Sequence, residues 1–251
     1  MDGKMLNISY KMKGLGLHEV WFAPIVPLDK KSLFGFYCYR DSRVESREKG
    51  LTEEIKYTLV NDLTIEKEKI FAGFKSNVRN EIRKGKKIPE FTYRGDYESR
   101  VAFLEFYRSF AKAKKLPEIK PYAIEKYGEN LFYLAGYLDN KLTNMQLYLI
   151  DKESGIVRLL HSISTLHEES DKTKRAKIGW INRYLHWHAI GYFIDHEFKS
   201  LDWGGYSNNP HSDLAGIDKF KASFGGQKIK LYDYYTLPYQ FIKTIQSKFL
   251  S

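Results

Sequence analysis

The sequence predicts an α+β fold in which helices flank a mixed, mostly antiparallel sheet. Apolar residues recur at helical spacing in three segments, which are residues 65–84, 97–115 and 178–193. Between the second and third helices lie three strand-like runs, at residues 131–139, 145–151 and 156–165. The turns that join them, Asp139-Asn140 and Ser154-Gly155, are short enough for hairpins, so these runs predict an antiparallel meander.

Composition limits the class of protein. Of the 251 residues, 43% are hydrophobic and 29% are charged, which suits one large globular domain or two small ones. No apolar run reaches about 18 residues, and residues 1–10 lack the apolar core of a signal peptide. The single cysteine, Cys38, lies among aromatic residues, so we expect a buried structural thiol in a cytoplasmic protein.

The net charge predicts an anionic partner. It is +10, from 41 Lys and Arg against 31 Asp and Glu, and suits a CoA pyrophosphate, a nucleotide-sugar, a tRNA or an anionic membrane surface. Residues 75–115 hold 12 basic and 5 acidic residues, so the electrostatic footprint is expected there. On the helix over 65–84, Lys75, Arg79 and Arg83 form a basic ridge, which suits either a solvated face or anion binding.

The remaining elements lie on either side of the core. In the N-terminal part we expect strands at residues 20–26 and 33–40 and a charged loop at 41–55. Near the C-terminus, a strand over 228–236 precedes an amphipathic helix that packs on the core or docks on a partner or on the inner face of a membrane. The predicted segments are residues 1–56 (N-terminal strands and loop), 57–237 (core domain) and 238–251 (amphipathic helix).

A basic loop at residues 168–178 leads into the third helix. It contains Lys172, Lys174, Arg175 and Lys177. Free N–H groups and the helix dipole favour an anion at a helix N-terminus, so this arrangement is typical of a phosphate-binding site.

The histidines argue against a metal site. His186 and His188 stand two positions apart on one predicted helix, so they point about 200° away from each other and cannot share an ion. We therefore expect no metal. His161 lies on an apolar strand face, where a histidine is more often part of the core than a catalyst.

The stretch Ser200–Gln227 organises the C-terminal half of the chain. A strand ends before Gly204-Gly205, and a polar loop and a short helix follow. Elements in this order commonly build a small-molecule site. Within the helix, Lys221 falls inside the apolar arc, so it either extends along the arc to solvent or is a partly desolvated cation over a pocket.

Several segments resemble FemAB-like proteins. They are TLVNDLT, FKSNVRNEIRKGKK, HSIST, NRYLHWHAI and DWGGYSNNPHSDLAGIDKFKASFGG. The last contains the signature G-[IL]-x-x-F-K-x-x-F-G, and the match spans residues 57–235. The resemblance implies the three-layer GNAT (acyl-CoA N-acyltransferase) fold. Members of the family transfer amino acids from aminoacyl-tRNA to peptidoglycan precursors, and GNAT-type relatives acylate sugars or amines from acyl-CoA or acyl-carrier protein.

The resemblance also implies roles for individual residues. Lys221 falls on the signature lysine, which would stabilise charge at the acyl carbonyl or the leaving group. Arg79 and Arg83 would contact substrate phosphates. The donor would bind against residues of the basic loop and the following helix, namely Lys174, Arg175, Lys177, Gly179 and Asn182. Gly179 stands one place late for the GNAT donor motif [QR]-x-x-G-x-[GA], so the sequence departs from the family there.

Acyl transfer to an amine further needs a base and a group that orients the acceptor. Asp202 and His161 are the predicted bases, although Asp202 also suits capping of the following loop. Tyr206 and Asn208 would orient the acceptor, and a simple turn is the alternative for Asn208.

Three functions follow as hypotheses. The first is an acyltransferase that uses acyl-CoA, most simply acetyl-CoA, to modify an amine or hydroxyl of an amino-sugar or another small-molecule or nucleotide-linked cell-envelope precursor. The second keeps the fold but uses aminoacyl-tRNA, which would explain the basic segment. The third is a non-catalytic module that binds RNA or an anionic membrane. None of them requires DNA.

Overall fold

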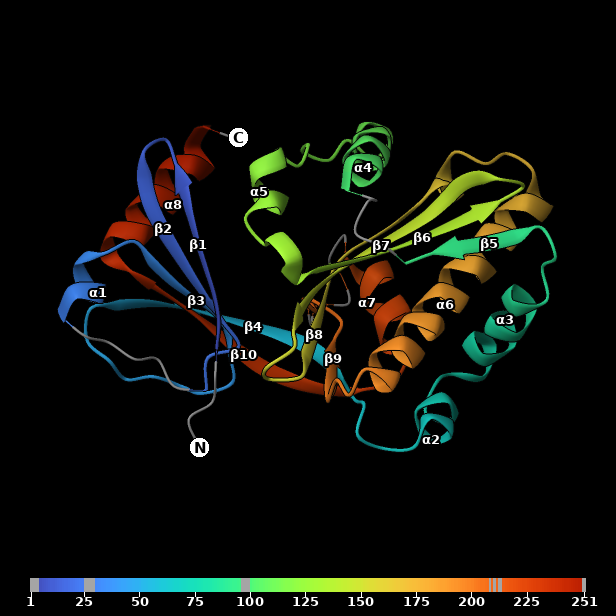
Figure 1. Cartoon of the computed structure of the whole chain (residues 1–251), viewed down its shortest axis with the longest axis horizontal. Helices are drawn as coiled ribbons and strands as arrows, with labels where there is room; N and C mark the ends of the chain where they lie inside the picture. Colours follow the sequence, from blue (N-terminus) through green and yellow to red (C-terminus); the bar gives the residue numbers. More distant parts are fainter. Residues whose placement is uncertain are drawn as a thin grey trace. The chain divides into compact units, whose positions relative to one another are not determined.

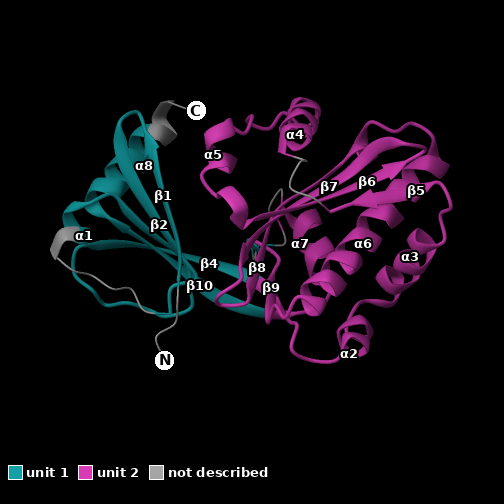
Figure 2. Cartoon of the chain, in the orientation of Figure 1, with its two compact units in different colours: residues 1–58, 205–210, 228–251 teal, residues 59–204, 211–227 magenta. Residues whose placement is uncertain are grey.

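The computed structural model describes residues 5–24, 30–95, 100–207, 209, 211 and 214–249. The chain forms two compact units, each assembled from separate parts of the sequence (Figure 2). Unit 1 contains residues 1–58, 205–210 and 228–251, and unit 2 contains residues 59–204 and 211–227. The predicted N-terminal and C-terminal segments therefore belong to the same unit.

Unit 1 is a small sheet with two helices. Its elements are β1 (Leu6–Met12), β2 (Leu15–Trp21), α1 (Lys30–Phe34), β3 (Tyr37–Ser42), the first part of β4 (Leu51–Asp62), β10 (Gln227–Thr236) and α8 (Leu237–Phe249). Strands β1 and β2 form an antiparallel hairpin, β3 pairs with β2 in parallel, and β10 pairs with β3 in antiparallel orientation. Cys38 is fully buried, and burial raises the pKa of its thiol to about 12, which confirms a structural thiol.

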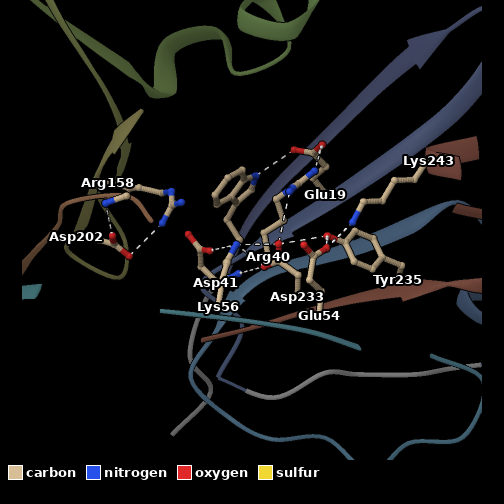
Figure 3. Close-up of polar contacts among 12 residues, drawn as sticks. Glu19, Arg40, Asp41, Glu54, Lys56, Arg158, Asp202, Asp233, Tyr235 and Lys243 are labelled. Atoms are coloured by element: carbon tan, nitrogen blue, oxygen red, sulfur yellow. Dashed lines mark hydrogen bonds and ion pairs between the residues drawn. The ribbon is translucent and has the colours of Figure 1, made fainter. Parts of the chain in front are cut away.

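Buried charges pair with one another in unit 1 (Figure 3). Glu19 is 1% exposed and accepts hydrogen bonds from Tyr10, Trp21 and Tyr239, each at 3.2 Å. These donors compensate for the lost hydration of the carboxylate, so the group is stable inside the sheet.

A second buried carboxylate in unit 1, Asp233, is held by cations. Lys56 Nζ lies 2.6 Å from Asp233 and 2.5 Å from Asp41, and Arg40 Nη1 lies 3.6 Å from Asp233. Burial acts to raise the pKa of Asp233, but Lys56 and Arg40 outweigh it and hold that pKa below its usual value.

Unit 2 carries the predicted meander. Its elements are α2 (Lys67–Ala72), α3 (Ser76–Lys86), β5 (Phe91–Arg94), α4 (Arg100–Lys114), α5 (Pro121–Glu125), β6 (Leu131–Leu138), β7 (Lys141–Asp151), β8 (Ile156–Ser164), α6 (Lys172–Asp195), β9 (Ser200–Asp202) and α7 (Ala215–Ala222), with short 3₁₀ turns at Gly128–Asn130 and Thr165–His167. Strands β6, β7 and β8 pair in antiparallel order, as predicted. Helix α6 lies along one face of these strands and α4 lies over the other (Figure 1).

The described strands form one mixed, ten-stranded order, β1-β2-β3-β10-β4-β9-β8-β7-β6-β5, in which β4 continues from unit 1 into unit 2. This mixed sheet with flanking helices agrees with the predicted α+β class. None of the helices in the described ranges has the length and hydropathy needed to cross a bilayer.

Five local predictions are wrong. The strand predicted over 20–26 is displaced, since β2 ends at Trp21. The helix predicted over 65–84 is divided into α2 and α3, and α2 ends before Gly73. Arg79 Nη1 of α3 donates to Ala72 O of α2 at 2.9 Å, which connects the two helices. The basic loop over 168–178 is largely helix, since Asp171 caps α6 by accepting from the N–H groups of Thr173 and Lys174. In addition, β4 begins inside the predicted loop 41–55, and the predicted strand 33–40 is divided between α1 and β3.

Helices α3 and α6 pack closely at Gly85. A Cβ atom at this position would lie 2.7 Å from Trp180 O and 2.9 Å from Tyr184 Cβ, so only glycine fits without movement of a helix backbone. Since β6–β8 pack on α6, this contact connects the two-helix layer to the sheet.

The first prediction tests this packing. Gly85→Ala should lower the free energy of unfolding by about 1–3 kcal/mol in urea denaturation, because overpacking outweighs the helix propensity of alanine. A Cβ atom at Gly216 of α7 would meet no other atom within 4 Å, so Gly216→Ala should be neutral or stabilising by up to about 1 kcal/mol. Equal effects of the two substitutions would contradict the packing argument.

Candidate functional site

Strands β8 and β9 separate after three paired residues. The parallel pairs are Ile156–Ser200, Val157–Leu201 and Arg158–Asp202. Beyond them β8 continues to Ser164, whereas the chain after β9 turns away through Gly204, whose φ is +65°. Separation of neighbouring parallel strands opens a crevice at their carboxyl ends, which is where open α/β sheets bind ligands.

The turn depends on Gly204. A Cβ atom there would lie 2.2 Å from Leu159 O, and the positive φ is itself unfavourable for other residues. Asp202 stabilises the same turn: its Oδ1 accepts from Gly204 N at 2.6 Å, and its Oδ2 lies 3.2 Å from Arg158 Nη1 (Figure 3). Asp202 is only 4% exposed, so this carboxylate positions the turn and does not line an open surface.

A cavity of about 430 Å³ lies beside this turn, entirely within unit 2. It is lined by residues of α4 and the segment after it, β8, α6, the end of β9 and α7, which are Tyr107, Phe110, Leu116, Leu159, Leu160, His161, Ser162, Ile163, Asn182, Trp203, Gly204, Gly216, Ile217, Phe220 and Lys221. Its volume and its mixture of apolar walls with a few polar groups are typical of small-molecule sites.

Lys221 extends from α7 into this cavity. Its Nζ donates a hydrogen bond to Gly204 O, so the ammonium lies at the point where the two strands separate. Burial, and next the nearby Arg158, lower the pKa of Lys221 to about 8, while Asp202 and Asp218 act in the opposite direction. The lysine is therefore a partly desolvated cation over a pocket, one of its two predicted positions.

His161 lines the α4 side of the cavity. Its ring lies 5.6 Å from that of Phe103 and 5.3 Å from that of Tyr107. Burial in these apolar surroundings lowers the pKa of His161 to about 4, so the imidazole is neutral near pH 7. Of the two predicted bases, His161 lines the cavity and Asp202 does not.

A chain of hydrogen bonds with a fixed direction ends at the cavity wall. Asn182 O can only accept, so the amide nitrogen of Gln146 faces it at 3.3 Å. The amide oxygen of Gln146 then accepts from Tyr148 Oη at 2.8 Å, and Tyr148 Oη accepts from His186 Nδ1 at 3.0 Å. His186 Nε2 is left to accept from Ser162 Oγ at 3.1 Å. Ser162 lines the cavity, so the chain ends at its wall.

The imidazole in this chain is neutral. Burial, followed by Arg183 and Lys221, lowers the pKa of His186 to about 3. Neither Ser162 nor His186 was among the residues predicted to form the site. A pattern in the sequence could have indicated this network. Asn144, Gln146 and Tyr148 alternate along a buried strand, which predicts hydrogen-bonded polar groups on one face.

The predicted donor-binding residues are only partly brought together. Asn182 lines the cavity, and its Oδ1 lies 3.4 Å from Ser162 Oγ. Lys174, Arg175, Lys177 and Gly179 lie in the first turns of α6 and are not among the residues that line the cavity.

Contacts of these helix residues explain their positions. Lys177 Nζ is 3.5 Å from Glu90 Oε2, and a Cβ atom at Gly179 would lie 3.4 Å from the Leu166 side chain. Two N–H groups at the start of α6 already donate to Asp171, which reduces the capacity of this helix end for an anion.

The described residues among those predicted to bind substrate also lie apart from the cavity lining. Arg79 donates to the carbonyls of Ala72 and Phe74, and Arg83 lies 5.4 Å over the ring of Phe71. Tyr206 belongs to unit 1, where its N–H donates to Tyr57 O at 2.7 Å. Asn208 lies outside the described residues.

A second hollow, of about 330 Å³, lies on the α2–α3–α6 side of unit 2. Its lining includes Lys67, Lys86, Trp187 and His188, and Lys67 Nζ lies 5.5 Å over the Trp187 ring. Across the described ranges, no group of three His, Cys, Asp or Glu side chains is arranged to hold a metal ion.

Solved structures share this fold. FemX has 12% identity and a TM-score of 0.67 over 97% of this chain and 88% of FemX. L-PGS from Bacillus licheniformis has 11% identity and a TM-score of 0.54 over 96% and 85% of the two chains. The C-terminal domain of a putative lysylphosphatidylglycerol synthetase from Agrobacterium fabrum has 9% identity and a TM-score of 0.55 over 97% and 87%.

No family model and no curated protein matches the sequence. At identities this low, the likeness to solved structures defines the fold alone. It confirms, at that level, the predicted resemblance to FemAB-like proteins.

The second prediction concerns stability in acid. The folded-state pKa of His161, about 4, lies below its ordinary value of 6.5, so the unfolded state binds more protons between these values and stability falls as the pH is lowered through them. His161→Phe removes this contribution. The wild type should therefore lose about 3 kcal/mol more than the variant between pH 7 and pH 4. Parallel stability curves would contradict the buried, neutral state of His161.

Proposed function

We propose that unit 2 is an acyltransferase, which moves an acyl group from an activated ester or thioester to an amine or hydroxyl. The observation that carries this proposal is the position of Lys221, a partly desolvated ammonium in a cavity where two strands separate. A fixed cation in a low-dielectric site is suited to the negative charge that develops on a carbonyl oxygen during acyl transfer.

In the proposed reaction, the acceptor nitrogen or oxygen forms a bond to the carbonyl carbon, and the bond from that carbon to the thiol or alcohol of the donor breaks. Lys221 stabilises the intermediate oxyanion or the leaving group. The proton lost by the acceptor passes to the leaving group. Neutral His161, which lines the cavity, is proposed to carry it from one to the other. Asp202 positions the turn, because both of its oxygens already have partners.

For the donor we propose an acyl-CoA thioester, with no metal. The phosphates of the donor would meet the side chains of Lys174, Arg175 and Lys177 at the start of α6. This assignment relies on side-chain charges more than on the helix end, since Asp171 already occupies two N–H groups there.

For the acceptor we propose a component of the cell envelope or its precursor, such as an amino-sugar. One solved structure of the same fold is the C-terminal domain of a putative lysylphosphatidylglycerol synthetase. Acyl transfer to an envelope component is therefore a chemistry compatible with this scaffold.

An aminoacyl-tRNA donor is the second candidate, and the charge of residues 75–115 favours it. The test is the dependence of binding on salt. A tRNA that contacts many phosphate-binding side chains should show a steep log–log slope, whereas a CoA ester contacts far fewer phosphates and should show a shallow one.

The third prediction tests the catalytic lysine. Lys221→Met should reduce acyl transfer at least 100-fold, measured as thiol released from an acyl thioester in the presence of an amine acceptor, because the oxyanion loses its cation. Lys219→Met, on the exposed face of the same helix, is the matched control and should transfer at the wild-type rate. Wild-type transfer by a folded Lys221→Met protein would rule out the proposed mechanism.

The fourth prediction concerns alkaline pH. The ammonium form of Lys221 is lost as the pH rises through about 8, so kcat/KM should decrease above that value. Lys221→Arg keeps its charge throughout this range and should show no such decrease, although its maximal rate will be lower because the guanidinium is larger. The pH–rate profiles of the two proteins measure the difference directly.

A further inference from the structure

We infer that the acyl group delivered at this site is an uncharged, apolar chain longer than acetyl, and not an aminoacyl group. This inference rests on the proposed function, because it takes Lys221 to mark the carbonyl end of the acyl group. It goes further by selecting one class of donor from those that the fold can accommodate.

The walls of the cavity beyond Lys221 are apolar. Phe110 and Leu116 come from α4 and the segment after it, and Ile217 and Phe220 come from α7. Leu116 is 46% exposed and Ile217 is 51% exposed, although both are large apolar residues at a cavity. A hydrocarbon chain in the cavity would remove them from water, which is a favourable change that a polar ligand could not provide.

The size of the cavity exceeds what an acetyl group requires. One water molecule occupies about 30 Å³ in the liquid, and an acetyl group has only three heavy atoms. It would fill a small part of a cavity of about 430 Å³. The volume therefore suits a medium-length or branched acyl chain.

The charges around the cavity oppose an α-ammonium group. Among the described residues that line the cavity, Lys221 is the one with a formal charge, which is positive, and none is Asp or Glu. An aminoacyl group would carry its ammonium next to the acyl carbonyl, and therefore beside Lys221, where the two cations would repel each other in a partly desolvated site. Two carboxylates act on Lys221 from outside the cavity lining. Asp202 pairs with Arg158 and accepts from Gly204 N, and Asp218 is 7% exposed on α7.

The polar groups of the wall, and His186 behind Ser162, are neutral. His161 and His186 are both uncharged near pH 7, because burial lowers their pKa values to about 4 and about 3. Ser162 donates its proton to His186, so it offers an accepting oxygen, which suits the N–H or O–H of an acceptor substrate but not full compensation of a cation.

The experiment measures binding without turnover. Thioesters of N-acetylcysteamine with straight acyl chains of two to ten carbons are titrated into the full-length protein, and dissociation constants are obtained by calorimetry. Affinity should rise about fourfold for each added methylene until the cavity is filled. A matched pair, the 4-methylpentanoyl and leucyl thioesters, differs only in the α-ammonium, and the leucyl compound should bind at least tenfold more weakly.

Variants locate the binding site. Ile217→Gln and Leu116→Gln should each weaken binding of the octanoyl thioester about tenfold, a larger loss than for the acetyl thioester. Val101 of α4 is 61% exposed and is not among the cavity residues, so Val101→Gln is the matched control and should bind every thioester as the wild type does.

The outcomes separate this inference from the proposed function. Affinity that does not depend on chain length, equal or tighter binding of the leucyl compound, or no binding of any thioester would overturn the inference. Loss of the proposed function would instead appear as thiol release that is unchanged in Lys221→Met. If the inference holds, Lys221→Met should retain the chain-length dependence of binding while it loses transfer.

Discussion

The early separation of β8 from β9 is the constraint on which the rest of unit 2 depends. Three residue pairs hold the strands together, and Gly204 then passes so close to Leu159 O that no side chain fits. Asp202 is held at this position by Arg158 and accepts from Gly204 N, so a buried ion pair and a glycine fix the same turn. The cavity exists because the backbone cannot continue the sheet there.

This geometry determines the electrostatics of the site. A lysine on the exposed face of a helix remains fully hydrated, but Lys221 extends over the separated strands, donates to Gly204 O and loses part of its hydration. The other groups that line the cavity are apolar or neutral, including His161, whereas the charged groups near the ammonium, Arg158, Asp202 and Asp218, do not line it. Under the proposed function, the desolvation that would make this cation effective toward an oxyanion would also make the cavity unfavourable for a second cation.

Unit 1 and unit 2 handle buried charge differently. In unit 1, Glu19 and Asp233 are surrounded by donors and cations, so their charges are compensated inside the protein and need no ligand. In unit 2, the polar chain that ends at Ser162 is neutral throughout, and Lys221 faces an open cavity. Buried charge thus serves structure in unit 1 and in the Arg158–Asp202 pair of unit 2, whereas Lys221 lines the cavity.

The sequence by itself determined the meander, the buried Cys38 and the signature around Lys221, because strand alternation, turn residues and a short motif are local properties. It could not determine the division of α2 from α3, the helical start of α6 at Lys172 or the network of Ser162 with His186. Capping and packing between distant segments decide these features. The tertiary structure alone decided that Lys221 and His161 share one cavity. The two residues are far apart in the sequence, on α7 and β8, and folding brings them together.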